Sequence, residues 1–404
     1  MNESGVYINK TKNCYVLNLT NFLFYFAYTL LFVKEIILDR TRIYELLGSN
    51  IANYLSLLCH VGFWCICIFI ILFMQRYTIR ELLVVLALLA FFILSVYSSK
   101  TYVLFDALLL VICSKKIDFD RYIKYSFYIQ TVCVCFIILL SLSGLIGQGV
   151  FVRGYDGTIR YALGFNHPNT LALLVFQWVC QYLYLKKDNA GIKRFIFASV
   201  LTLATYVFTD SNTGFIMTII IIVCDFIYEK LFNKLFGWNI MKRIIKTVLF
   251  VGSIVLICVI RYYWVNPDKL EAQTLMARIN LAKKYLTAYG INLFGQQVVS
   301  GNDVIIPGFQ RGYYFLDNAY AWLLINIGVV VTVCIVVGYV LYIKNLLRNK
   351  NWNLIIAVTA YLIYALSERT TMMIVFNSLL VGFGSVVYKK FGQTDNKNEG
   401  INNE

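Results

Sequence analysis

The residue types best suited to chemistry gather in one segment, 152–170, which reads VRGYDGTIRYALGFNHPNT. Arg153 and Arg160 contribute guanidinium groups, which stay charged and hold phosphate oxygens through parallel hydrogen bonds. Pro168 suits the first turn of a helix, and the free amides and positive dipole end of a helix N-terminus attract anions. The segment therefore predicts a phosphate or pyrophosphate site. The alternative is that the arginines only contact lipid headgroups.

His167, one of two histidines in the chain, directly precedes Pro168 at the mouth of this helix. A side chain that titrates near neutral pH can act as a general base toward a substrate hydroxyl. The alternative is structural, because Asn166 or His167 would cap the helix. Asn169, in the first turn, is a candidate substrate ligand. The second histidine, His60, lacks comparable neighbours, so we interpret it as structural.

Other helices expected to enter from the same side begin with polar residues. These are the run 210–213, the pair Asp317 and Asn318, and the pair Glu368 and Arg369. Such side chains either cap helices or bind sugar hydroxyls. A charged pair at a membrane boundary usually has a partner or a cavity, so we take these four paired residues as candidate substrate ligands.

The sequence predicts neither a metal nor a cofactor site. The outward segments offer several arginines but no compact carboxylate cluster of the kind that Mg²⁺ requires. Cys65/Cys67 and Cys133/Cys135 form two C-x-C pairs inside apolar runs, and we interpret them as small apolar residues. Despite a formal net charge of +15, nucleic-acid binding is not predicted, since the cations lie in short loops between apolar runs.

Apolar residues make up 60% of the 404 residues and charged residues only 14%, whereas ordinary soluble domains carry about 25% charged residues. A run of roughly 20 apolar residues crosses the ~30 Å hydrocarbon layer. The sequence therefore predicts an all-α, polytopic integral membrane protein of about twelve transmembrane helices. The predicted spans lie near 15–33, 54–74, 79–97, 101–114, 125–147, 169–185, 195–209, 213–228, 247–263, 318–342, 352–367 and 370–387.

Charge predicts the orientation of these spans. When the loops are assigned alternately to two sides, most of the 36 lysines and arginines fall on one side, which the positive-inside rule makes cytoplasmic. Both termini are then cytoplasmic, and two long segments, 148–168 and 264–317, face outward. Long loops often carry function, so we expect any chemistry on the extracytoplasmic face.

The spans would form a single membrane domain, 1–388, followed by a tail, 389–404, whose polar composition predicts disorder and a cytoplasmic location. The larger outer segment contains a D-x-x-E pattern at 268–271 and a candidate helix-ending glycine, Gly290. These signals predict a helix near 269–289. Its apolar stripe suggests that it lies on the membrane surface or covers the bundle.

Residues 160–171, RYALGFNHPNTL, resemble an R-x-x-L-G-F-x-H-P-N-T-L-like stretch of Gram-positive Wzy-type polymerases of capsular or exopolysaccharide repeat units. Weaker similarities follow in the same order at 209–214, 277–295 and 317–320. The spacing from Arg153 to Gly164 fits the arginine-x-ten-glycine pattern of O-antigen polymerases. The second outer segment departs from that pattern, because Arg278 reaches a glycine one residue late.

The resemblance implies a glycosyltransferase of the bacterial cell membrane that uses undecaprenyl-pyrophosphate-linked oligosaccharides and no cofactor. The growing chain would move from its lipid pyrophosphate to a hydroxyl of the next lipid-linked unit. Arg160 and Arg278 would hold the pyrophosphate, and His167 would deprotonate or orient the acceptor hydroxyl. Supporting contacts would come from Arg153, Arg311 and Arg369. Implied partners are membrane lipids and the flippase and chain-length regulator of the same pathway.

Three other functions remain open at this stage. A ligase-type transferase of the same architecture would deliver the polymer to a different acceptor. A flippase or transporter for lipid-linked oligosaccharide is disfavoured by the long outer segments and by the absence of paired Pro/Gly interruptions in two halves of the chain. An acyltransferase that uses His167 is the third alternative.

Overall fold

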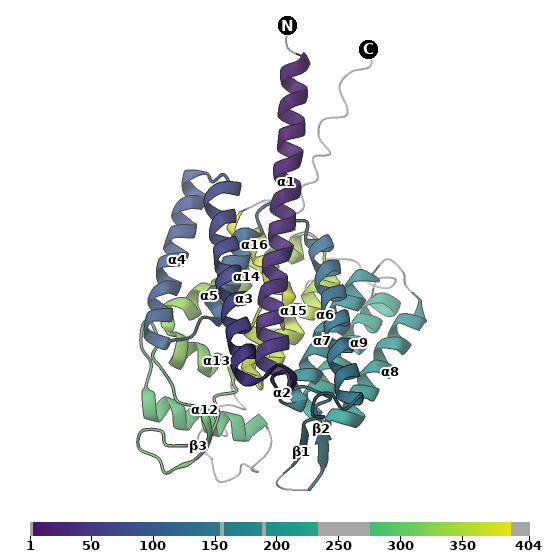
Figure 1. Ribbon diagram of the computed structural model, residues 1–404, viewed down its shortest axis with the longest axis vertical. Coiled ribbons are helices and arrows are strands. Elements are labelled where there is room, and N and C mark those ends of the chain that lie inside the picture. The colour runs from purple at the N-terminus through teal and green to yellow at the C-terminus, as the bar shows by residue number, and fades with distance from the viewer. Residues whose placement is uncertain (1–2, 154–156, 188–190, 233–274, 389–404) are drawn as a thin grey trace.

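The computed structural model describes residues 3–153, 157–187, 191–232 and 275–388, and it is mostly helical (Figure 1). Within these ranges, seven helices are long and apolar enough to cross a membrane. They are Leu17–Leu38, Ser49–Met74, Ile79–Ser99, Phe119–Leu142, Ile192–Thr209, Asn212–Lys230 and Val329–Arg348. The structure is therefore that of an all-α, multi-pass membrane protein.

Two short hairpins interrupt the succession of helices. The first part comprises α1 (Glu3–Phe32) with its π-helical continuation η1 (Val33–Leu38), α2 (Tyr44–Leu47), α3 (Ser49–Phe69) with η2 (Ile70–Met74), α4 (Ile79–Ser99), α5 (Val103–Cys113) and α6 (Phe119–Leu142). The antiparallel hairpin β1 (Val150–Val152) and β2 (Ile159–Tyr161) precedes α7 (Pro168–Leu185), α8 (Ile192–Thr209), α9 (Asn212–Ile227) and η3 (Tyr228–Phe232). The last part comprises α12 (Leu275–Tyr289), the antiparallel hairpin β3 (Gly301–Val304) and β4 (Gly312–Tyr314), α13 (Ala319–Trp322), η5 (Leu323–Ile327), α14 (Val329–Arg348), α15 (Trp352–Tyr364), the 3₁₀ turns η6 (Arg369–Met372) and η7 (Ser378–Phe383), and α16 (Gly384–Val387).

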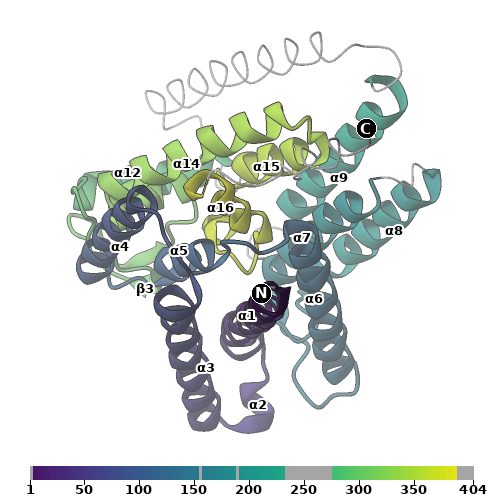
Figure 2. The same cartoon turned by 90° about the horizontal axis from the view of Figure 1, so that it is seen from above.

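The helices divide into a buried centre and an apolar rim. Most side chains of α5, α7 and α15 are buried, as are those of η7. By contrast, α3, α4, α6, α8 and α14 expose many large apolar side chains, which suits a surface covered by lipid. Figure 2 shows α16 enclosed between α5, α7 and α15.

The two hairpins and the helices that accompany them lie at one end of the bundle. Figure 1 shows α2, the β1–β2 hairpin, α12 and β3 together at this end, whereas α1 begins at the opposite end. We call it the loop-bearing end. The two segments that the sequence predicts to lie on one face, 148–168 and the described part of 264–317, therefore do share one end of the molecule.

One predicted span, 318–342, is interrupted in the structure. Gly328 has a φ of +103° and separates η5 from α14. A Cβ at Gly328 would lie 2.2 Å from the nitrogen of Gly295, so two glycines permit this close backbone crossing. The crossing segment supplies the carbonyls of Asn292 and Leu293 to the first amides of α14, at 3.1 and 3.0 Å.

The expectation of a continuous helix over 370–387 is wrong, because this stretch forms η6, η7 and α16. The backbone groups that a helix would have paired are satisfied by neighbouring side chains. The Tyr361 hydroxyl donates to the Phe376 carbonyl at 2.8 Å, and the Asn377 amide donates to the Thr371 carbonyl at 3.1 Å. Irregular backbone is tolerated at membrane depth only where protein surrounds it, and this segment is buried.

The remaining predictions concern the helix near 269–289, the span 247–263 and the tail 389–404. The helix predicted near 269–289 is present as α12 and ends before Gly290, whose φ is +68°; its predicted start lies outside the described residues. α12 buries Ile279 and Tyr285 and packs on α13 and η5, so it covers the bundle. The predicted span 247–263 and the tail 389–404 lie outside the described residues.

Candidate functional site

The β1–β2 hairpin holds Arg160 at the loop-bearing end, in register with Phe151. The chain then turns sharply at Gly164, whose φ is +90°. A Cβ at Gly164 would lie 3.0 Å from Cγ2 of Ile137 on α6, so the turn requires glycine. This turn brings His167 to the first turn of α7.

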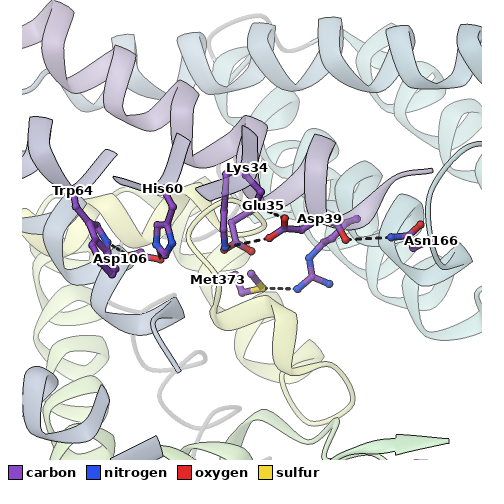
Figure 3. Close-up of polar contacts among 10 residues, drawn as sticks. Lys34, Glu35, Asp39, His60, Trp64, Asp106, Asn166 and Met373 are labelled. Carbon is purple, nitrogen blue, oxygen red and sulfur yellow. Dashed lines mark hydrogen bonds and ion pairs between the residues drawn. The ribbon is translucent and has the colours of Figure 1, made fainter. Parts of the chain in front are cut away.

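The start of α7 is joined to the chain that follows η1. The Asn166 amide donates to the Arg40 carbonyl at 2.8 Å, and the Arg42 amide donates to the Gly164 carbonyl at 2.8 Å. The Asn166 side chain also donates to the Asp39 carbonyl at 3.1 Å (Figure 3). The two segments form a short antiparallel ladder, although more than a hundred residues separate them in sequence.

His167 caps α7, as one of its two predicted roles requires. Its Nδ1 accepts a hydrogen bond from the Asn169 amide at 3.1 Å, and its ring lies 5.5 Å from that of Phe151, between centroids. Partial burial, with the positive charges of Arg160 and Arg278 nearby, lowers the pKa of His167 to about 4. The imidazole is therefore neutral at neutral pH.

The cap also determines which nitrogen of His167 carries the proton. Because Nδ1 accepts a hydrogen bond, the neutral ring is protonated at Nε2. The side chain remains partly exposed, and Nε2 forms no hydrogen bond with any other described residue. His167 therefore offers a hydrogen-bond donor at the loop-bearing end, rather than an unprotonated base.

Both arginines of the first segment are engaged at the turn between α8 and α9. Arg160 donates through Nε to the Thr209 carbonyl and through Nη2 to Oδ1 of Asn169, each at 2.8 Å. Arg153 pairs with the Asp210 carboxylate at 2.8 Å and with its carbonyl at 2.6 Å. These contacts hold the hairpin, α7 and α8 together, so both arginines position the site.

Arg278 on α12 differs, because it makes no hydrogen bond or ion pair with another described residue. Its Nη1 is buried and has no partner. Its positive charge nevertheless affects the pKa of His167 on α7 and of Asp317 before α13. Arg160 and Arg278 are thus near enough to His167 for their charges to affect its pKa, and the predicted roles of these three residues stay predictions.

Asp317 completes the cluster with an acceptor. Burial, together with the negative charge of Glu368, raises the pKa of the Asp317 carboxyl, and Arg278 and Arg369 oppose that shift. Among the described residues, no hydrogen bond or ion pair engages this carboxyl. Glu368 accepts a hydrogen bond from the Thr370 hydroxyl at 2.8 Å.

Asn318 holds the two acidic residues near each other. Its Oδ1 caps α13 by accepting from the Ala321 amide at 2.9 Å, and its Nδ2 donates to the Leu366 carbonyl at 2.8 Å. The second bond joins the start of α13 to the turn that carries Glu368 and Arg369. We therefore assign Asn318 a structural contact, and its predicted role in substrate binding stays a prediction.

Arg311 lies apart from the cluster. It is on the β3–β4 hairpin, its side chain is 66% exposed, and it pairs with Asp303 at 3.3 Å. An exposed ion pair of this kind contributes little to stability. No contact places Arg311 beside Asp317 or His167, and its predicted supporting role stays a prediction.

Sequence reasoning missed Arg40 and Lys100. Together with Arg369, they line a polar cavity of about 340 Å³ at the loop-bearing end. A signal was present, because Lys34, Glu35, Asp39 and Arg40 form a charged run directly after the first apolar span. Figure 3 shows the Lys34 ammonium between the carboxylates of Glu35 and Asp39.

His60 has a richer environment than the sequence suggested. Its Nε2 lies 2.9 Å from Oδ2 of Asp106, and the Trp64 indole donates to Oδ1 of the same carboxylate at 2.7 Å (Figure 3). These contacts join α3 to α5 and satisfy both carboxylate oxygens. The structural interpretation of His60 therefore has a physical basis in this pairing.

The arrangement suits the departure of a phosphorylated group. An arginine whose buried Nη1 has no partner and a neutral Nε2–H donor can stabilise negative charge, and a carboxyl that no described residue engages can accept a proton. Comparison of the chain with known protein families, with curated proteins and with solved structures gives no match.

Proposed function

We propose that this protein is a Wzy-type membrane glycosyl polymerase. It joins undecaprenyl-pyrophosphate-linked oligosaccharide repeat units into capsular or exopolysaccharide on the outer face of a bacterial cell membrane. About twelve spans and cytoplasmic termini belong to this proposal. One observation carries it: beside the family-like motif at 160–171, where Arg160 bonds Asn169 and His167 caps α7, the charges of Arg278 and Asp317 from two distant segments act on His167.

The reaction transfers a saccharide from pyrophosphate to a hydroxyl. The bond from the sugar C1 to the pyrophosphate oxygen breaks, and a bond from C1 to the acceptor oxygen forms. The acceptor proton moves to the Asp317 carboxylate, and undecaprenyl pyrophosphate leaves with the bonding electrons. The glycosyl pyrophosphate itself supplies the driving force, so the reaction requires no nucleotide triphosphate.

The cations stabilise the leaving group. Arg278 has a buried Nη1 without a protein partner, and charge-assisted hydrogen bonds to phosphate are among the stronger ones in proteins. His167 donates from Nε2 to the pyrophosphate or to the acceptor hydroxyl. Arg160 holds Asn169 and the N-terminus of α7 in place. Cations and amides of this kind can stabilise the developing charge without Mg²⁺.

Deletion of the gene and analysis of lipid-linked saccharides tests the proposal. A polymerase defect leaves single repeat units on the outer face and no polymer. Single units trapped on the inner face would instead establish a flippase, and free polymer on its lipid would establish a ligase. Polymer of normal length lacking acyl groups would establish an acyltransferase, and each of these three results would overturn the proposal.

Complementation then ties the function to the cluster. Asp317→Asn should fail to restore polymer, whereas Arg121→Gln should restore it. Arg121 is a suitable control because its side chain is 79% exposed and lies at the opposite end of the bundle, in the first turn of α6. Full restoration by Asp317→Asn, Arg278→Gln and His167→Gln alike would remove the cluster from the reaction.

A further inference from the structure

Arg40 is a partly buried cation at the loop-bearing end. Its Nη2 lies 3.0 Å from Sδ of Met373, and its guanidinium lies 5.1 Å from the centre of the Phe376 ring. Its Nε is buried and has no partner, and no described carboxylate forms an ion pair with it. Leaving a buried charge unpaired is costly, so this arrangement favours an anionic ligand.

The cavity beside Arg40 has the charge to hold such a ligand. Its volume is about 340 Å³, and three cations line it: Arg40, Lys100 and Arg369. No aspartate or glutamate is among the described residues that line it. The nearby Glu35 is already paired with Lys34 at 2.5 Å. Serine, threonine and amide side chains complete the wall, namely Ser99, Thr101, Gln297, Ser300, Asn326 and Thr370.

An apolar groove of about 590 Å³ is lined by residues of α4, α5 and α14, the first two of which also contribute to the cavity or its edge. Along α4, Ser99 lines the cavity, and Phe92, seven residues earlier and therefore on the same helix face, lines the groove. Along α5, Val103 lines the cavity and Leu104 lines the groove. The cavity and the groove therefore lie against the same two helices, α4 and α5.

The groove follows α4 toward the opposite end of the bundle. From Phe92 it continues past Leu88 and Val84 to Thr78, a distance of about 20 Å at 1.5 Å per residue. α14 and the segment η7–α16 form its other wall, through residues such as Val337 and Leu380. A long hydrocarbon chain would be buried in it against apolar side chains.

We propose that the cavity and groove together bind one polyprenyl pyrophosphate, with its pyrophosphate against Arg40, Lys100 and Arg369 and its isoprenoid chain between α4 and α14. Three cations complement the several negative charges of a pyrophosphate better than the single charge of a phospholipid phosphodiester. The cavity and the groove together therefore fit a lipid with one hydrocarbon chain and a diphosphate head group.

This site is separate from the Arg278 cluster but adjacent to it. Arg369 lines the cavity, and its charge also affects the Asp317 carboxyl. The turn that carries Glu368 and Arg369 therefore separates the two sites. Resting on the proposed function, the inference assigns the second site to the acceptor lipid, whose saccharide reaches Asp317 across this turn.

Direct binding tests the inference without depending on turnover. The full chain in lipid nanodiscs is titrated calorimetrically with geranylgeranyl pyrophosphate, with inorganic pyrophosphate, geranylgeraniol and phosphatidylglycerol as competitors. Two binding sites are expected in the native protein. Arg40→Gln should weaken one of them by about tenfold or more, as expected for the loss of a charged hydrogen bond.

A second variant tests the groove itself. Val84 lines the groove and its side chain is 40% exposed, so Val84→Trp fills the groove with little risk to folding. This variant should weaken geranylgeranyl pyrophosphate at the same site and leave inorganic pyrophosphate unchanged. Arg121→Gln, at the opposite end of the bundle, should retain both sites.

Two results would overturn the inference. One is that Arg40→Gln and Val84→Trp, both folded, retain two sites of native affinity. The other is that phosphatidylglycerol competes as well as geranylgeranyl pyrophosphate, which would make the cavity a phospholipid site. Two intact binding sites, together with normal polymer after deletion of the gene, would instead count against the proposed function alone.

Discussion

Protonation decides what His167 and Asp317 contribute to the proposed reaction. The Asn169 amide occupies Nδ1 of His167, so the neutral ring can donate from Nε2 but has no free lone pair to accept a proton. Asp317 has the opposite character, since burial and Glu368 raise the pKa of its unpaired carboxyl. A raised pKa makes a carboxylate a stronger base, and the base therefore falls to Asp317.

His167 should remain neutral well below the usual pKa of a histidine. Its pKa is lowered from 6.5 to about 4, although water at the exposed part of the ring screens part of this shift. Nitrogen-15 NMR of histidine-labelled protein should show an Nε2-protonated ring at pH 6, titrating only at lower pH. The chain has two histidines, so a His60→Gln variant assigns the signals.

The same shift predicts how stability depends on pH. The unfolded chain binds this proton at a higher pH than the folded protein does. The contribution of His167 to the free energy of unfolding is therefore fully present above about pH 6.5 and is lost as the pH falls toward 4. His167→Gln should flatten the fall of the melting temperature over this range. An unchanged slope in the variant would show that His167 is not protonated on unfolding there.

Asp317→Asn should lower polymerisation by about 10²–10⁴-fold, the usual contribution of a general base, while lipid-linked donor still binds. Because the pKa of Asp317 is raised, activity should fall on acidification at a higher pH than an ordinary aspartate would allow. Asp303→Asn is the control, since Asp303 lies at the same end with a 70% exposed side chain. Native turnover by Asp317→Asn would exclude it as the base.

Arg160 and Arg278 should respond differently to lysine. Arg160 uses two nitrogens on two protein acceptors, Thr209 and Asn169, and lysine cannot reproduce that fork. Arg160→Lys should therefore lose about 1 kcal/mol of stability together with turnover. Arg278 makes no hydrogen bond with another described residue, so Arg278→Lys keeps the charge without losing such a contact. This variant should therefore retain more activity. Melting curves and polymer length measure the two effects.

At the level of helices and turns, apolar length predicts where the chain crosses the bundle but not where it breaks. The span over 79–97 corresponds closely to α4, because most of its side chains are apolar and face outward and no break interrupts the helix. The break at Gly328 depends on Gly295, more than thirty residues away. Nothing in the local composition distinguishes a buried 3₁₀ segment such as η7 from a helix, since both are apolar.

The candidate site shows the same limit. The motif at 160–171 and the cap before Pro168 are local, so sequence identified them. The ladder between Arg40 and Asn166 and the pairing of His60 with Asp106 join distant segments. A single sequence carries no record of such contacts, and for this reason Arg40 was missed.

Gly328→Ala should destabilise the protein more than Gly308→Ala. Both positions have positive φ, of +103° and +79°, and a left-handed conformation costs an L-residue roughly 1–2 kcal/mol. Only at Gly328 would the new Cβ also meet backbone, at 2.2 Å, whereas nothing lies within 4 Å at Gly308. Melting temperatures in detergent compare them. Equal losses would mean that the chain at Gly295 moves aside.

At the scale of the whole molecule, both long segments lie at one end of the bundle, so one labelling experiment tests on which side of the membrane they lie. Val152→Cys on β1 and Asn302→Cys on β3 should both react with an impermeant thiol reagent in intact cells, in a background without accessible native thiols. Arg121→Cys should react only after lysis, because it lies at the opposite end. Labelling of Arg121→Cys alone in intact cells would invert the topology.

The ladder between the chain after η1 and the start of α7 has a consequence for the two proposed sites. Arg40, which faces the cavity, and Asn166, which precedes the histidine cap, share a backbone hydrogen bond of 2.8 Å. A ligand that draws Arg40 toward itself therefore displaces the same backbone that orients His167. Binding at the two sites is then thermodynamically linked, and each lipid must change the affinity for the other by the same factor.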